Sequence, residues 1–303
     1  MNQLTRRELL EMAAAGMLLS GTATSAMAAN NERIIISGAS GQLGGQAIKE
    51  LLAKGVAAKN LILVSRTPDV LLQYAKLGAA TRFGDFAKPE SLAAAFAGGT
   101  RMLLISIGTG AGPRPIAHGH AIDAAKTAGV KQIAYTSWLG ISKGDSQGIA
   151  VDHVATEDLL RKSGVAYTFL RNSLYMEILL PQATKMLADG KATLPPGEVR
   201  VGYVSRNDCA AAAAAALAGP GHDDKIYDIT GPALIGVSDI AAAATAATGK
   251  PIVLVPADPN APAGRSFAGP SIAFTSTAVA DLTGRPATSI KAFLAENRAK
   301  LSG

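Results

Sequence analysis

From residue 33 to residue 170 the chain alternates between short apolar runs and longer segments with helical periodicity. The apolar runs predict strands at 33–37, 61–65, 80–84, 102–106, 132–136 and 166–170. The segments between them predict helices near 43–54, 69–77, 88–97, 115–128 and 151–163. Strands that alternate with helices in this way form parallel βαβ units. The sequence therefore predicts an α/β fold with a doubly wound parallel sheet of the Rossmann type.

The pattern becomes less regular after Arg171, where Pro181, Pro195 and Pro196 interrupt the chain. This part predicts helices at 207–218 and 237–249, strands at 225–230 and 251–255, a loop at 257–272, and two short helices near 276–284 and 288–300. We expect residues 31–170 to form the nucleotide-binding domain and residues 171–303 to form a small C-terminal α/β lobe, on the substrate side, that packs on it.

Composition narrows the class of protein. Hydrophobic residues make up 48% of the 303 residues and charged residues 17%, which is enough apolar material for a large core. The net charge of +6 comes from scattered cations, so nucleic-acid binding is not expected. The single cysteine, Cys209, excludes an internal disulfide, and no cluster of His, Cys or carboxylates predicts a metal site. Beyond the N-terminus no apolar stretch could span a membrane.

Residues 1–28 have the pattern of an export signal. Arg6 and Arg7 precede an apolar stretch, and Ala26 and Ala28 form a cleavage pattern of small residues. The segment resembles the bacterial twin-arginine signal, although Leu9 stands where Phe is commonest. We therefore expect a periplasmic or otherwise exported protein that uses the twin-arginine machinery. A general secretory signal and an ordinary leader helix are the alternatives.

A glycine pattern follows the first predicted strand and opens the first helix. Its spacing is G-x-x-G-x-x-G, with Gly38, Gly41 and Gly44. Glycine permits a tight turn and a close approach of phosphate to the free N–H groups of a helix N-terminus. In this strand–turn–helix context the pattern predicts a dinucleotide site rather than a purely structural turn. The predicted pyrophosphate contacts are Gly38, Ser40, Gly41, Gln42, Leu43 and Gly44.

The ends of the next strands suggest which dinucleotide binds. The second strand ends in Ser65-Arg66, where proteins that prefer NAD(H) usually carry an acid. A guanidinium can bind a 2′-phosphate, so we expect NADP(H) to be preferred over NAD(H), unless Arg66 is only a solvated loop residue. After the third strand, Asp85 could accept from the adenine with Phe86 beside the ring, or could serve only as a helix-entry residue. Ser106 should lie under the ribose on the nicotinamide side.

Three further segments make the likeness more specific. They are 124–137, 153–157 and 167–175, which contain the runs AAKTAGVK, YTS, HVATE and YTFLRN. Together with the glycine pattern they resemble the NmrA-like, atypical short-chain dehydrogenase/reductase family, and within it most of all the bacterial NAD(P)H:quinone oxidoreductases. The likeness continues at 204–208, 229–232 and 283–286, so it covers nearly all of 33–300.

The resemblance implies bound NADP(H), with Ser106, Ser137, Asn172 and Tyr175 on the nicotinamide and acceptor side. It also implies a site histidine at His153. Family members have a longer, partly helical stretch where this chain has a Pro-, Gly- and Ala-rich loop between Pro256 and Asp281. Because that stretch flanks the expected acceptor site, the resemblance does not fix the acceptor.

Carbonyl reductases of the short-chain type use a Tyr-x-x-x-Lys pair, in which the lysine lowers the pKa of the tyrosine. None of the six tyrosines has a lysine four residues later. A quinone needs less help with protonation, so we expect hydride transfer from NADPH to a quinone-like or other small electrophilic acceptor. The catalytic candidates are His153, Tyr175 and Asn172, and each could instead be structural: a buried histidine, a packing tyrosine and a helix N-cap.

Two other functions need no such pair. One is a non-catalytic NADP(H)-binding redox sensor of the NmrA type, and the other is an NADP-dependent epimerase or isomerase that retains its cofactor. Turnover of NADPH with simple quinones would separate the reductase from the sensor. A homodimer is also compatible with the sequence.

Overall fold

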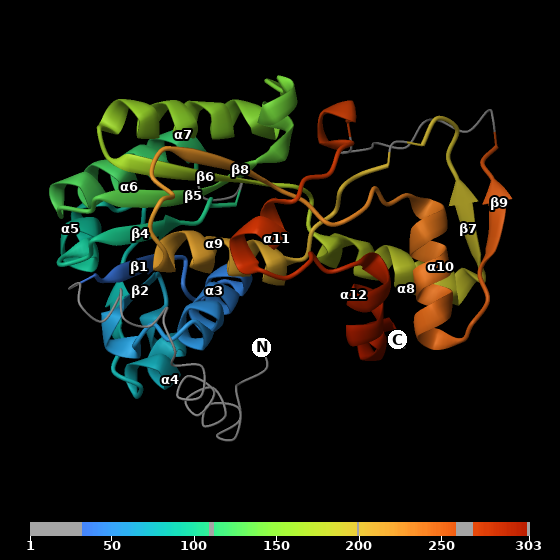
Figure 1. Ribbon diagram of the computed structural model, residues 1–303, viewed down its shortest axis with the longest axis horizontal. Coiled ribbons are helices and arrows are strands. Elements are labelled where there is room, and N and C mark those ends of the chain that lie inside the picture. Colours follow the sequence, from blue (N-terminus) through green and yellow to red (C-terminus); the bar gives the residue numbers. More distant parts are fainter. Residues whose placement is uncertain (1–31, 109–111, 199, 259–268, 302–303) are drawn as a thin grey trace. The chain divides into compact units, whose positions relative to one another are not determined.

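The computed structural model describes residues 32–108, 112–198, 200–258 and 269–301. The predicted export signal therefore lies outside the described residues, as does most of the loop predicted at 257–272. In the described part of the chain, seven strands form one sheet in the order β3-β2-β1-β4-β5-β6-β8 (Figure 1). Their bounds are β1 Ile34–Ser37, β2 Leu61–Ser65, β3 Ala80–Phe83, β4 Arg101–Leu104, β5 Gln132–Trp138, β6 Ala166–Asn172 and β8 Lys225–Ile229.

The strand order contains a reversal that locates a ligand site. Strands β2 and β3 extend the sheet on one side of β1, whereas β4 and β5 extend it on the other. All four of these pairings are parallel, and Ile34 of β1 aligns with Leu61 on one side and Arg101 on the other. The carboxyl ends of β1 and β4 therefore border the topological switch point, where doubly wound sheets bind their ligands. The predicted fold class is confirmed.

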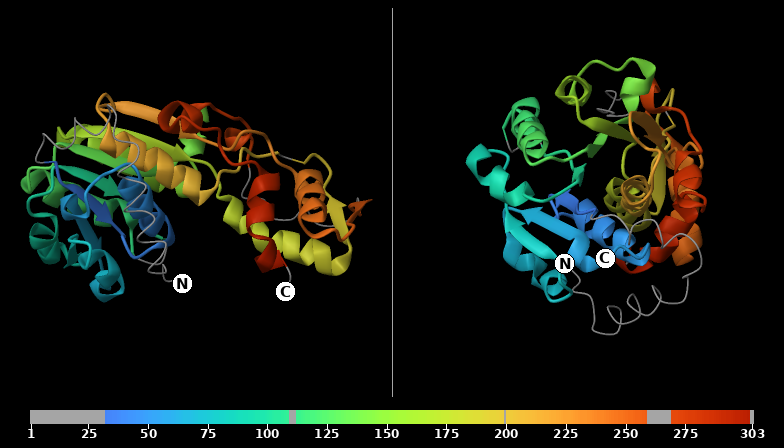
Figure 2. Two further views of the ribbon diagram at one scale, coloured as in Figure 1. Left: turned by 60° about the horizontal axis from the view of Figure 1, so that its bottom comes forward. Right: turned by 60° about the vertical axis from the view of Figure 1, so that its left-hand side comes forward.

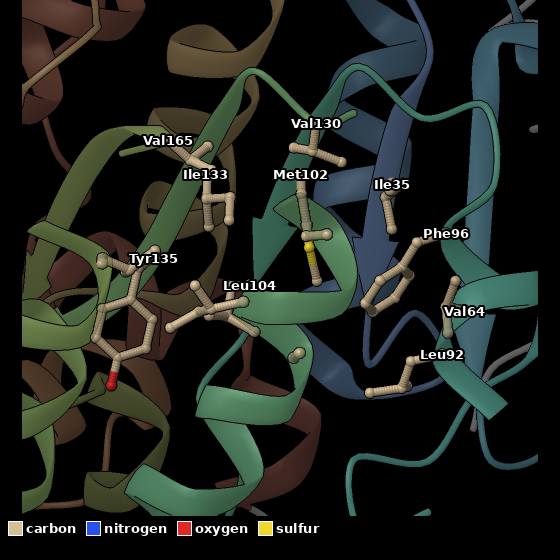
Figure 3. Close-up of a cluster of buried hydrophobic side chains, with 14 of the residues drawn as sticks. Ile35, Val64, Leu92, Phe96, Met102, Leu104, Val130, Ile133, Tyr135 and Val165 are labelled. Atoms are coloured by element: carbon tan, nitrogen blue, oxygen red, sulfur yellow. The ribbon is translucent and has the colours of Figure 1, made fainter. Parts of the chain in front are cut away.

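Helices cover both faces of the sheet. Helices α5 Leu92–Phe96, α6 Arg114–Thr127 and α7 Ile149–Ser163 pack on one face, and α3 Gln42–Ala53 and α9 Arg206–Ala218 lie on the other (Figures 1 and 2). Apolar side chains fill the first face, where Ile35, Phe96, Met102 and Leu104 are fully buried in one cluster (Figure 3). Short helices fill the connections, with α4 at Leu72–Ala75.

The chain forms two compact units. The first contains the described residues up to Ser137, together with Gln147–Leu170 and Ala210–Tyr227. The second contains Trp138–Ser146, Arg171–Cys209 and the described residues from Asp228 onward. Each unit is assembled from several segments because the chain passes from one to the other more than once. No described helix has the length and apolar character needed to cross a bilayer.

The second unit has its own core. Apolar side chains from four helices form it, among them Leu187, Ile240 and Phe293. These helices are α8 Leu179–Asp189, α10 Val237–Thr248, α12 Ile290–Glu296 and α13 Arg298–Leu301. A further short helix, α11, spans Ala278–Thr283. A two-stranded parallel sheet of β7 Lys191–Leu194 and β9 Val253–Pro256 completes the unit.

Two elements of this unit were not predicted from the sequence. Helix α8 contains Pro181, which suggested an interruption, but Pro181 is the third helical residue and lies in the first turn, where proline is tolerated. Strand β7 has only four residues, two of them exposed, and its pairing partner β9 is about sixty residues away. The residues of α8 and β7 alone therefore do not indicate that a helix and a strand form there.

Candidate functional site

The turn between β1 and α3 is built around its glycines. Gly38 has a φ of +65°, which favours glycine, and its carbonyl accepts from the Gly41 N–H at 2.9 Å. A Cβ at Gly44 would lie 2.4 Å from the Gly38 oxygen and 2.9 Å from Ala39 Cα. Because both neighbours are backbone, only glycine allows α3 to begin this close to the end of β1.

The N-terminus of α3 is open to an anion. Gly41 is the N-cap and has no side chain to occupy the first N–H groups of the helix. The N–H groups of Gln42, Leu43 and Gly44 therefore have no acceptor within α3, as helix geometry requires. Together with the helix dipole they form a typical phosphate-binding arrangement.

Ser40 and Ser65 connect this turn to the end of β2. Their hydroxyl oxygens are 2.6 Å apart, and Ser65 Oγ also accepts from the Thr67 N–H at 2.9 Å. The Ala39 N–H donates to the Val64 carbonyl at 3.0 Å. The backbone that follows β2 is therefore fixed relative to the glycine turn.

Arg66 comes directly after this anchored position. Its side chain is exposed and makes no hydrogen bond or ion pair with any residue that the structure describes. A guanidinium without a partner, held one residue beyond a buried strand end, fits the phosphate that distinguishes NADP(H) from NAD(H).

Asp85 and Phe86 follow β3. Asp85 Oδ1 accepts from the Ala87 N–H at 3.1 Å, so this carboxylate takes part in the turn that leads to α5. Phe86 is partly buried and meets the ring of His118 edge-on, with centroids 6.3 Å apart. Contact of either residue with an adenine ring stays a prediction.

Ser106 lies two residues after the end of β4, and Ser137 is the last residue but one of β5. Ser106 is partly buried, and its N–H donates to Thr136 Oγ1 at 2.8 Å. The buried Ser137 hydroxyl donates to Glu157 Oε1 at 2.7 Å. Glu157, itself buried, pairs with Arg161 at 2.9 Å. Ser137 is therefore coupled to α7, and a contact with cofactor is a prediction for both serines.

His153 lies in a buried polar cluster of the first unit. Its Nδ1 is 2.7 Å from the hydroxyl of Tyr135, which is fully buried at the carboxyl half of β5. Burial, and secondarily the positive charge of Arg114, lower the pKa of His153 to about 3. Burial likewise raises the pKa of Tyr135, so the pair is neutral at neutral pH. Donation of a proton from His153 to an acceptor stays a prediction.

His118 belongs to the same cluster. Its Nε2 accepts from the Ile107 N–H at 3.2 Å, so the ring proton is on Nδ1, which donates to Thr156 Oγ1 at 3.0 Å. Burial, His153 and Arg114 together lower the pKa of His118 to about 3.

These two histidines predict a pH-dependent stability. A folded-state pKa of about 3 is below the unfolded value near 6.5, so the unfolded chain binds more protons between these limits. The free energy of unfolding should be highest above pH 6.5 and fall as the pH decreases, by about 1.4 kcal/mol per pH unit for each histidine. Urea titrations between pH 7 and pH 5 measure this slope. His153→Asn should have the shallower slope, and equal slopes would contradict the argument, because both proteins share the same carboxylates.

Asn172 and Tyr175 lie in the second unit. Asn172 is the last residue of β6 and not a helix N-cap, and its Nδ2 is 3.5 Å from the Tyr175 hydroxyl. The Asn172 Oδ1 atom is buried and has no hydrogen-bond partner among the described residues, as is the case for the neighbouring Ser173 Oγ. Burial raises the pKa of Tyr175, so its phenol stays protonated, and the Arg206 guanidinium lies 4.9 Å from the ring centre. Contact of either residue with the cofactor or the acceptor stays a prediction.

No motif in the sequence indicates that Tyr135, His118 and Arg114 form one cluster with His153. Their contacts join residues 18 to 38 positions apart, for example Arg114 with Asp152 at 3.0 Å and His118 with Thr156. Helices α6 and α7 bring them together only when both pack on the sheet. No spacing rule within either helix would have indicated this. No three His, Cys, Asp or Glu side chains of the described segments gather as metal ligands would.

A parallel sheet whose first strand turns through glycine into an open helix N-terminus, beside a switch point, defines a dinucleotide-binding protein of the Rossmann type. The comparison with known families agrees: a model described as NAD(P)H-binding matches residues 38–220. The chain belongs to this family. The predicted resemblance to NmrA-like reductases and bacterial quinone oxidoreductases is confirmed.

Three similar proteins are reductases. Quinone oxidoreductase 2 of Escherichia coli is 36% identical over 72% of this chain and 76% of its own length. The NAD(P)H azoreductase of Xenophilus azovorans is 30% identical over 72% of this chain and 75% of its own length. The solved structure of Citrobacter sp. triphenylmethane reductase, complexed with NADP(H), has a TM-score of 0.76 and 29% identity and covers 88% of this chain and 99% of that one.

Proposed function

We propose that this protein is an NADPH-dependent oxidoreductase that reduces a quinone-like or other small electrophilic acceptor. The observation that carries the proposal is the phosphate cradle of α3, with Arg66 following the adjacent strand and having no partner in the described part of the chain. The relatives of the chain are named as reductases. Those relatives are named for a quinone, azo compounds and triphenylmethane compounds. All three are conjugated electrophiles, which supports an acceptor of that kind.

The residues of the chain fit NADP(H). Gly44 lets α3 begin close to the end of β1. The N–H groups of Gln42 and Leu43 would hold the pyrophosphate, and Arg66 would hold the 2′-phosphate. When bound, NADPH supplies the hydride from its nicotinamide ring. The chain would bind and orient the cofactor and the acceptor and would exclude water from them. The absence of a Tyr-x-x-x-Lys pair agrees with an acceptor that needs little acid catalysis. Contact of Asn172 with the acceptor or the carboxamide stays a prediction from the family resemblance.

The test is the oxidation of NADPH by the purified protein with a simple benzoquinone, an azo dye and a triphenylmethane dye. The proposal expects turnover with at least one of them. Tight NADPH binding without turnover of any acceptor would favour the redox sensor. Conversion of a substrate with no net change in the cofactor would favour the epimerase or isomerase.

Arg66 predicts the cofactor preference. Arg66→Ala should weaken NADPH binding by about tenfold to a hundredfold, which corresponds to the loss of a charged hydrogen-bonding partner. NADH binding should change little, because NADH has no 2′-phosphate. Titration of both nucleotides, followed by fluorescence, measures the change. Lys76→Ala removes an exposed cation from the same unit and should leave both affinities unchanged. Equal loss for both nucleotides would show that Arg66 does not read the phosphate.

We further propose that residues 1–28 direct the protein to the periplasm or beyond through the twin-arginine machinery. The pair Arg6-Arg7 supports this route, which carries folded proteins and so permits loading of the cofactor before export. Fractionation of cells that produce the full chain, with and without Arg6→Lys and Arg7→Lys, tests it. Retention of the double variant in the cytoplasm is expected, and unchanged export would indicate the general secretory route.

A further inference from the structure

The segment that follows β4 is held almost entirely by side chains. Strand β4 ends at Leu104, and no ladder extends to residues 105–107 in the described chain. The Ile105 N–H donates to Ser37 Oγ of β1 at 2.9 Å, and the Ser106 N–H donates to Thr136 Oγ1 of β5 at 2.8 Å. Both neighbouring strands therefore hold this segment through a hydroxyl and not through their backbone.

Ile107 is held on both of its backbone groups. Its N–H donates to His118 Nε2 at 3.2 Å, and its carbonyl accepts from Arg114 Nε at 2.9 Å. Both side chains come from α6 and are almost completely buried: His118 is 0% exposed and Arg114 is 4% exposed. We call His118, Arg114 and the Ile107 backbone the Ile107 latch.

The latch is itself oriented by α7. His118 Nδ1 donates to Thr156 Oγ1, which donates to the Asp152 carbonyl at 2.8 Å. The second guanidinium nitrogen of Arg114 pairs with the Asp152 carboxylate at 3.0 Å. His118 must be neutral to accept from the Ile107 N–H, so its remaining ring proton is on Nδ1. The donor and the acceptor of each hydrogen bond from Ile107 to Asp152 are therefore defined. Two helices thus fix both backbone groups of one residue.

The position of the latch indicates what it serves. Residues 105–107 leave β4 at the switch point, beside the glycine turn that leaves β1, and a Cβ at Gly38 would lie 3.8 Å from Ile105 Cβ. Burying a histidine and an arginine costs free energy that burying a hydrophobic pair would not. Their use on one loop residue therefore points to a requirement for its conformation. In a dinucleotide site of this type, β2 serves the adenine half and the β4 side serves the other half.

We propose that His118 and Arg114 are positioning residues that hold Ile107 in the conformation that receives the nicotinamide half of NADP(H). The inference rests on the proposed function. This role requires no contact of either side chain with the nicotinamide or the acceptor. They act by presenting a preformed backbone, so that binding does not have to order this segment.

The probe that isolates this role is 2′,5′-ADP, which contains the adenine half and the 2′-phosphate but no nicotinamide. His118→Leu removes the acceptor of the Ile107 N–H and should weaken NADPH binding by about tenfold while leaving 2′,5′-ADP binding nearly unchanged. His118→Gln places an amide oxygen where Nε2 accepts and should restore most of the NADPH affinity. Thr136→Val releases Ser106 from the β5 side and should change the ratio of the two affinities in the same direction, which keeps the test open if His118→Leu does not fold.

The matched control is Thr168→Val in β6. Thr168 is a buried threonine of the same unit whose hydroxyl accepts from Gln132 and donates to the His222 carbonyl at 2.6 Å. This variant should lose stability without changing the ratio of NADPH to 2′,5′-ADP affinity. Equal weakening of both ligands by His118→Leu, or an equal change in ratio for Thr168→Val, would overturn the latch. A wild-type protein that binds neither ligand would overturn the proposed function itself.

Discussion

Replacing Gly44 by alanine is expected to weaken NADPH binding by at least about a hundredfold and to lower the melting temperature. The added Cβ would meet the Gly38 oxygen at 2.4 Å and Ala39 Cα at 2.9 Å, and backbone atoms cannot move aside as a flexible side chain would. Helix α3 would have to shift away from β1, which moves the N–H groups of Gln42 and Leu43 from the phosphate. Calorimetric titration with NADPH and thermal unfolding measure the two effects.

Gly45→Ala is the matched control for this prediction. Gly45 is the next residue of α3, and a Cβ there would have no neighbour within 4 Å. Alanine is favoured over glycine inside a helix by about 1 kcal/mol, so this variant should be slightly more stable and should bind NADPH normally. If Gly44→Ala bound NADPH as well as Gly45→Ala does, the close approach of α3 to β1 would not be what forms the cradle.

Replacing Asp208 by alanine should lower the free energy of unfolding by about 3 kcal/mol. Asp208 is fully buried near the start of α9, and its carboxylate accepts from Ser205 Oγ at 2.8 Å, the Thr288 N–H at 2.8 Å and Arg285 at 2.6 Å. Its removal leaves these donors without an acceptor and releases the segment that leads to α12. Urea denaturation and hydrogen exchange at the Thr288 amide measure the loss.

An exposed aspartate serves as the comparison for Asp208. Asp189 pairs with Lys185 at 2.8 Å at the end of α8, and the side chains are 38% and 76% exposed. Asp189→Ala should cost no more than about 0.5 kcal/mol, because exposed pairs of this spacing contribute little. A similar loss for both variants would mean that the buried hydrogen bonds of Asp208 do not hold the C-terminal segment.

The N-terminal half of the fold could be predicted because its determinants are local. The apolar runs of β1 to β6 fall within a few residues of the observed strands, and the three glycines at 38, 41 and 44 mark the turn that the structure shows. Buried parallel strands require continuous apolar residues, and a phosphate turn requires glycine at fixed positions. These are requirements on single segments, which a sequence displays directly.

The candidate site could be predicted only in part, because its contacts join residues that are distant in the sequence. The sequence identified His153 and Asn172 as candidates from their likeness to a family, but it gave no indication that His153 Nδ1 contacts Tyr135 or that Asn172 Oδ1 is buried without a partner. Helix α8 and strand β7 were missed because their stability depends on contacts with α10 and β9, far along the chain. Propensity is a weak guide wherever such distant packing decides the structure.

The sequence by itself determined the class of fold, the glycine turn and the cation that follows β2, because each depends on residue types at short, fixed spacing. Only the tertiary structure decided that His118 and Arg114 hold Ile107, that Asp208 binds the segment before α12, and that Arg66 is left without a partner among the described residues. Burial lowers the pKa of His118 and of His153 and strengthens the buried hydrogen bonds, and burial exists only after distant segments have packed together.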